Sequence, residues 1–236
     1  MSTLSKDSLD SRKLIETLDR LCLRIEDRFP AAGLLQAARN LLDVARETDQ
    51  TIRWIERPNL PMRALSIAVI VLLLGGLAYS FSQLRLELQS LGLKGLVEFS
   101  EAALNELILL GAAIVFIVTF EARRKRQRVI TAVNRLRAIA HVIDAHQLTK
   151  DPDGVTNVST PTKHSPQRTM TAYELRRYLD YCSELQSLIG KIAFLYVQKF
   201  DDPIAADAVN SLETLTTGLS RKVWQKIMIL RDVDRG

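Results

Sequence analysis

The side chains of this 236-residue chain that are best placed to do chemistry lie in the segment NRLRAIAHVID. Four polar residues share one side of the helix predicted there, at spacings of three, four and three: Asn134, Arg137, His141 and Asp144. Together they could bind an anion or a nucleotide, or His141 could switch its charge near neutral pH under the influence of Arg137 and Asp144. The alternative is a solvated or interprotomer polar face, held by pairs one helical turn apart.

The same segment holds Arg135 and His141, with five residues between them. This pair resembles the R-x4-6-H signature of HEPN ribonucleases, and the resemblance covers these two residues alone. It implies cleavage of RNA. The chain would then be a membrane-tethered ribonuclease, the most remote of the functions considered.

Other catalytic and ligand-binding signatures are missing. The sequence has no glycine-rich phosphate loop, no H-E-x-x-H and no G-x-S-x-G motif. The Asp-x-Asp-Gly run that begins at Asp151 lacks the later ligands of a calcium loop. Cys22 and Cys182 occupy apolar positions of helical patterns, where cysteine is usually a small core residue. We therefore expect no catalytic, metal-binding or cofactor-binding residues, no cofactor and no enzyme activity.

Two apolar segments dominate the middle of the chain. The first contains 21 consecutive uncharged residues and predicts a transmembrane helix at about 64–81. The second has 14 residues between Glu106 and Glu121, about 21 Å of helix against a hydrocarbon core of about 30 Å. Extended to 102–120, it predicts a second span after a short external connection at 82–101. Glu106 would then lie at the outer interface or be the one acid inside the membrane.

The charges around these segments predict the orientation. Five cations follow the second segment closely: Arg123, Arg124, Lys125, Arg126 and Arg128. Short loops rich in Lys and Arg stay in the cytoplasm, so both termini are expected there, in a multi-pass protein of the inner (plasma) membrane. The cluster is expected to fix this topology and to bind anionic lipids. Nucleic acid is not expected as a partner, because no aromatic residues are interleaved with the cations.

The remaining sequence has helical periodicity. Residues 1–62 are expected to form an N-terminal helical hairpin in the cytoplasm, residues 63–120 the transmembrane hairpin, and residues 121–236 a cytoplasmic helical domain with a mobile loop at 149–170. The second span is expected to continue into a long cytoplasmic helix, because no Gly or Pro occurs from Ala112 to Thr149. The predicted fold class is therefore an all-α integral membrane protein with a two-span hairpin and a cytoplasmic helical bundle.

Two local patterns refine this prediction. A heptad stripe of the coiled-coil type follows the second helix of the N-terminal hairpin, at Leu34, Ala38, Leu41, Ala45, Thr48, Ile52 and Ile55. The stripe is either the packing face of an antiparallel hairpin or a seam between protomers. Thr171 and Glu174 have the spacing of a capping box, which predicts the start of another helix.

These features predict a membrane-anchored, self-associating helical interaction module without catalytic activity, such as a scaffold, sensor or signal transducer. Gly75, Gly76 and Gly111 would let helices approach closely in a homo-oligomer. Its further partner would be an unidentified cytoplasmic protein or small molecule. The alternative is an oligomeric two-span channel or membrane-disrupting effector, gated by its cytoplasmic domain.

Overall fold

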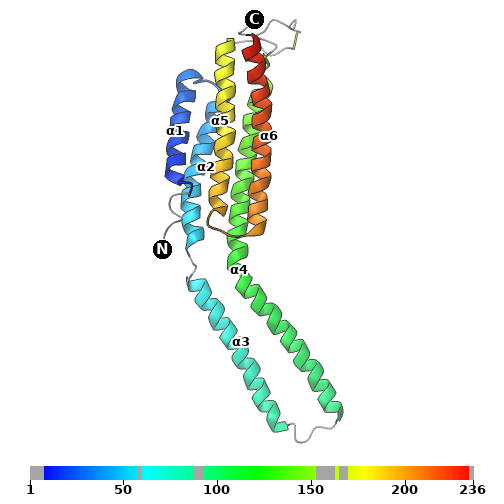
Figure 1. The fold of residues 1–236 in the computed structure, drawn as a ribbon. Coiled ribbons are helices and arrows are strands. Elements are labelled where there is room, and N and C mark those ends of the chain that lie inside the picture. The colour runs from blue at the N-terminus through cyan, green and yellow to red at the C-terminus, as the bar shows by residue number, and fades with distance from the viewer. Residues whose placement is uncertain (1–7, 58–59, 88–92, 153–162, 165–169, 234–236) are drawn as a thin grey trace. The chain divides into compact units, whose positions relative to one another are not determined.

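The computed structural model describes residues 8–57, 60–87, 93–152, 163–164 and 170–233. These residues form six helices: α1 (Ser11–Arg28), α2 (Gly33–Glu56), α3 (Leu60–Glu87), α4 (Leu93–Leu148), α5 (Ala172–Val197) and α6 (Pro203–Val233) (Figure 1). The prediction of an all-helical chain is confirmed. Most of the loop predicted at 149–170, and part of the connection predicted at 82–101, lie outside the described residues.

The chain divides into two compact units. One unit combines residues 1–56 with residues 128–236, and the other consists of residues 57–127. We call the first the bundle, because it holds α1, α2, α5, α6 and the last part of α4. We call the second the α3–α4 unit. Helix α4 runs from Leu93 to Leu148 and contributes residues to both.

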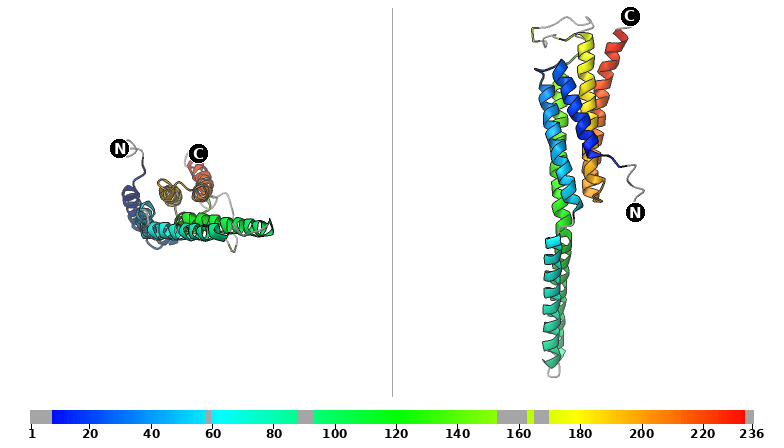
Figure 2. Two further views of the ribbon diagram at one scale, coloured as in Figure 1. Left: turned by 90° about the horizontal axis from the view of Figure 1, so that it is seen from below. Right: turned by 90° about the vertical axis from the view of Figure 1, so that its left-hand side faces the viewer.

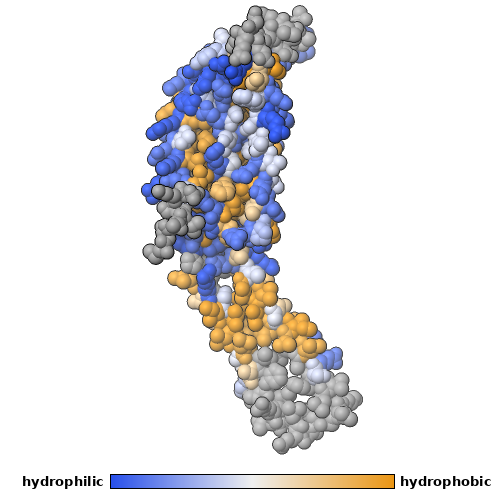
Figure 3. All heavy atoms as spheres, in the orientation of Figure 1, coloured by the Kyte–Doolittle hydropathy of each residue, from blue (hydrophilic) through white to orange (hydrophobic). Residues whose placement is uncertain are grey.

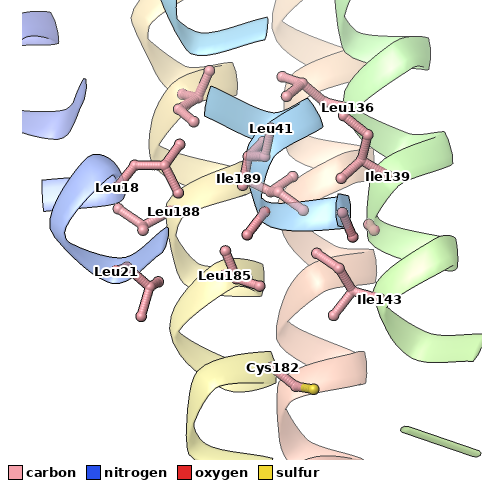
Figure 4. Close-up of a cluster of buried hydrophobic side chains, with 14 of the residues drawn as sticks. Leu18, Leu21, Leu41, Leu136, Ile139, Ile143, Cys182, Leu185, Leu188 and Ile189 are labelled. Carbon is pink, nitrogen blue, oxygen red and sulfur yellow. The ribbon is translucent and has the colours of Figure 1, made fainter. Parts of the chain in front are cut away.

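The bundle is built around α5. This helix packs against α1, α2 and α6, and Figure 2 shows α5 and α6 side by side in both views. Fourteen residues of α5 are buried, including Tyr181, Leu185 and Ile189. Leu18 and Leu21 of α1, Leu41 of α2, and Leu136 and Ile143 of α4 point into the same core (Figure 4). A helix that is apolar on most of its circumference must be enclosed by others, and α5 occupies that position.

Capping residues determine where α5 and α6 begin. The Thr171 side chain accepts from the Glu174 amide at 3.2 Å, and the Glu174 carboxylate accepts from the Thr171 amide at 2.8 Å. The predicted capping box is therefore confirmed. The Asp202 carboxylate accepts from the Ala205 amide at 3.0 Å and caps α6, which begins at Pro203.

The heptad stripe of α2 is buried within this chain. Leu34, Ala38, Leu41 and Thr48 are each 0% exposed, and Ile52 is half-buried. The stripe is therefore the packing face of the α1–α2 hairpin against the rest of the bundle. The alternative interpretation, a seam between protomers, is wrong because this surface is already covered by α1 and α5.

The two predicted membrane spans are not found. Within the described part of the chain, no helix combines the length and apolarity needed to cross a membrane.

This finding corrects three predictions. The two-span hairpin at 64–81 and 102–120, the external connection at 82–101, and the multi-pass inner-membrane location with cytoplasmic termini are wrong. The prediction rested on the hydropathy of the two segments, which measures their preference for an apolar environment and does not identify that environment. The side chain of Glu106, assigned above to the membrane or its interface, lies outside the described residues.

Candidate interaction site

The predicted polar quartet on α4 is separated into two parts. Arg137 Nη1 donates to Asn134 Oδ1 at 3.3 Å. Asp144 accepts instead from Gln147 Nε2, at 2.7 Å, and is partly buried. His141 is exposed on the same helix. The structure thus shows two pairs within one helix, and both the role in anion binding or switching and the alternative of a polar face remain predictions.

The two residues of the HEPN-like signature are not brought together. Arg135 forms an ion pair with Glu47 of α2. Helix α4 is continuous over Arg135 and His141. Side chains six residues apart on a helix point about 120° away from each other. The described geometry therefore offers no shared site for this pair.

The basic cluster has partners within its own chain. Lys125 is only 9% exposed; its Nζ lies 2.9 Å from Glu121 Oε1 and donates to the Arg57 carbonyl at 3.3 Å. Glu121 also pairs with Arg63, at 3.0 Å.

Two further cations of the cluster lie over aromatic rings. The Arg128 guanidinium lies 3.8 Å from the ring centre of Trp54, and the Arg123 guanidinium 5.7 Å from that of Phe116. Such contacts stabilise a cation over a ring. Part of the cluster therefore has an internal structural role, which the sequence analysis missed. The binding of anionic lipids remains a prediction.

The most extensive exposed feature of the α3–α4 unit is apolar. Fifteen large apolar side chains of the α3–α4 unit are 39–73% exposed, and we call them the apolar surface. They are Leu60, Leu65, Ile67, Val71, Leu72, Leu74 and Tyr79 of α3, with Leu104, Leu107, Ile108, Leu109, Val115, Phe116, Val118 and Phe120 of α4. Figure 3 shows hydrophobic residues gathered on these helices, whereas hydrophilic residues predominate on the face of the bundle in view.

Open glycine positions occur on the same two helices. A Cβ atom at Gly75, Gly76 or Gly111 would meet nothing within 4 Å. No charged residue occurs between Ala64 and Leu84 in α3 or between Leu107 and Phe120 in α4. Apart from Leu60 and Leu104, the residues of the apolar surface therefore lie in uncharged stretches, and the glycines of these stretches are accessible to another backbone.

The cysteines lie in the bundle core. Cys22 and Cys182 are buried and unpaired. Burial raises the pKa of Cys22 to about 11 and that of Cys182 to about 12, so both thiols are protonated at neutral pH. This confirms their interpretation as core residues. Among the residues that the structure describes, no three His, Cys, Asp or Glu side chains gather as metal ligands would.

The structure also shows a polar groove that sequence analysis did not detect. The groove has a volume of about 450 Å³ and lies between α5 and α6. Its lining consists of Ser183, Gln186, Ser187, Gly190 and Lys191 of α5, with Glu213, Thr216, Thr217 and Ser220 of α6. Gln186 is 1% exposed, and its Nε2 donates to the Ala140 carbonyl at 2.9 Å. Its Oε1 has no hydrogen-bond partner among the described residues. A pattern in one helix could not reveal this groove, because two helices form it.

A lysine fixes the C-terminal end of α4 from the neighbouring helix. Lys226 Nζ of α6 donates to the carbonyls of Gln147 and Lys150, at 2.9 Å and 3.2 Å. Burial lowers the pKa of Lys226, opposed by the nearby carboxylates of Asp151 and Asp144. The contact satisfies carbonyl groups that a helix end leaves without partners.

These features define a class: an all-helical protein in which an apolar helical unit is inserted into a helical bundle. No protein-family model matches the chain, and neither the curated proteins nor the solved structures include a significant match to it.

Proposed function

We propose that this protein is a helical interaction module without catalytic activity, and that it binds its partner through the apolar surface of α3 and α4. Such a module can act as a scaffold, a sensor or a signal transducer. The observation that carries the proposal is the exposure of fifteen large apolar side chains on one unit of the chain.

The physical reason is the cost of leaving this surface in water. Each Val, Leu, Ile or Phe side chain gains about 1.5–3 kcal/mol when it is fully buried. Soluble proteins rarely expose large contiguous apolar patches, and those that do use them to bind other molecules. Phe116 and Tyr79, which are 54% and 66% exposed, are of the kind that dominates binding energies at interfaces.

The bundle supports this proposal by its contrast with the α3–α4 unit. Its apolar side chains are mostly enclosed in one core, and most of its exposed large apolar residues are separated from one another along the chain, apart from Trp224, Met228 and Ile229 of α6. Leu23 of α1 and Leu148 of α4 are 55% and 66% exposed in this way. Isolated exposed residues are normal in soluble proteins. The two residues therefore provide matched controls for the apolar surface.

Photo-cross-linking in intact cells tests the proposal. A photoreactive phenylalanine derivative would replace Leu109, which is 71% exposed on the apolar surface, or Val71, which is 62% exposed. The control places the same derivative at Leu23 in the bundle. We expect adducts of defined mass from both positions on the apolar surface and few from the control. Equal yields at all three positions, or no adducts from Leu109 and Val71, would contradict the proposal.

A further inference from the structure

We infer that the partner of the apolar surface is a second copy of this chain. The α3 and α4 helices of two chains would then pack as a four-helix assembly. This inference rests on the proposed function and identifies the partner that the surface binds.

The charge distribution favours a copy of the same surface. The ion pair between Arg63 and Glu121 and the buried Lys125 lie outside the apolar stretches. A partner with charged groups at its interface would have to remove them from water without a compensating charge in the apolar stretches of α3 and α4, which is costly. A second apolar surface of the same composition carries no such cost.

The size of the surface is adequate for a stable dimer. The gain on burial given above corresponds to roughly 60–120 Å² of apolar area for each buried side chain. Fifteen side chains at the observed exposures then provide roughly 550–1,100 Å². A stable interface requires about 800 Å² from each partner. This requirement lies within the range that the apolar surface provides when all of it is covered.

The glycines supply positions of close approach. The distance between two packed helices depends on the side chains at the contact, and it is shortest where these are small. Gly76 of α3 and Gly111 of α4 have open space where a side chain would be. In a dimer with two-fold symmetry each chain presents the same patch, so one glycine contact occurs twice.

The first experiment measures the mass of the full chain. Purified without detergent, the protein is expected to sediment at about twice 26.6 kDa. Replacing Val71 and Leu109 together by lysine should give a monomer with unchanged helix content, because both side chains are exposed within one chain. The control variant, Leu23→Lys with Leu148→Lys, should remain a dimer. A wild-type protein that is monomeric, or a control that dissociates equally, would overturn the inference.

The second experiment uses the open glycines. Gly111→Leu adds a side chain at a position with nothing within 4 Å, so the single chain has space for it. It should raise the dissociation constant of the dimer by about tenfold or more, because the added side chain holds the second copy away. Gly218→Leu is the matched control, since Gly218 of α6 is equally open but lies in the bundle. Equal dissociation constants for the two variants would contradict close packing at Gly111.

The results separate failure of the inference from failure of the proposed function. If the wild-type protein is a monomer but still forms cross-links from Leu109, its apolar surface binds a different partner. That result would exclude a second copy as the partner and would support the proposed interaction function. A monomer without such cross-links excludes both. Flotation of a monomer with phosphatidylcholine vesicles would assign the surface to lipid and overturn the inference.

Discussion

His146 of α4 lies directly against Gly33, the first residue of α2. A Cβ atom at Gly33 would stand 2.3 Å from His146 Cε1 and 2.8 Å from Nε2. Contacts this short do not occur, so the imidazole can occupy its place only because residue 33 has no side chain. Glycine is required here by a neighbouring side chain, whereas Gly218 of α6 has open space around it.

This contact predicts opposite effects for the same substitution at two glycines. Gly33→Ala should lower the free energy of unfolding by about 0.5–1.5 kcal/mol, because the half-buried imidazole of His146 must turn out of its place. Gly218→Ala should raise it by about 0.5–1 kcal/mol, because alanine is the better residue inside a helix. Urea denaturation measures both. Adding His146→Ala to Gly33→Ala should restore part of the loss, and a double variant no more stable than Gly33→Ala would contradict the steric explanation.

A buried hydrogen bond joins α2 to α5. The Thr48 hydroxyl donates to the Val44 carbonyl at 2.7 Å, so the Tyr196 hydroxyl, 2.8 Å away, donates to Thr48 Oγ1. Tyr196→Phe should therefore cost about 1 kcal/mol of stability. A double-mutant cycle with Thr48→Val measures the coupling between the two side chains. Additive effects of the two substitutions would show that the bond contributes nothing.

The core cysteines predict resistance to thiol reagents and a loss of stability at high pH. Because burial raises the pKa of Cys182 from 9.0 to about 12, the folded protein retains a proton that the unfolded chain releases. This contribution to stability is fully present below pH 9 and is lost as the pH rises towards about 12. At pH 10.5 roughly 2 kcal/mol of this contribution to the free energy of unfolding should remain.

The comparison of wild type with Cys182→Ala isolates this effect from other titrating groups. The stability of the wild type should fall more steeply between pH 8 and pH 10.5 than that of the variant. At pH 8, Cys182 should react with iodoacetamide only when the protein is unfolded. Labelling of the folded protein at the rate of a free thiol would show that the side chain is accessible.

The contact of Lys226 with the end of α4 predicts a local effect. Lys226→Met should leave the Gln147 and Lys150 carbonyls without their charged donor, and the last turn of α4 should open more often. Hydrogen exchange should become faster at residues 145–150 and stay unchanged in α5. Lys222→Met, at an exposed position one turn earlier on α6, is the control. Equal exchange in the two variants would contradict a role for Lys226.

Local patterns predicted the bundle helices well. Capping at Thr171, the apolar stripe of α2 and the buried cysteines all depend on residues within a few turns of one another, and the structure confirms them. The membrane prediction failed because hydropathy measures the preference of a segment for an apolar environment and does not identify that environment. An apolar helix that binds another protein has the same composition.

The site features that were missed depend on contacts between distant segments. The burial of Lys125 depends in part on the Arg57 carbonyl, 68 positions earlier. The groove between α5 and α6 requires two helices to be packed first. None of these contacts has a signature in the sequence of one segment.

The insertion of residues 57–127 into the bundle has a consequence for the order of folding. The hydroxyls of Thr48 and Tyr196 meet although 148 positions separate them, and 71 residues lie between α2 and the part of α4 that belongs to the bundle. Closing a flexible loop of that length costs about 2 kcal/mol more than closing a five-residue turn. Helices α5 and α6 are joined by a short connection and can pair early, whereas α1 and α2 must wait for a slower, long-range encounter. During synthesis on the ribosome, the apolar helices therefore emerge before the core around α5 can form. They are exposed to water, to chaperones or to each other until α5 and α6 have been synthesised.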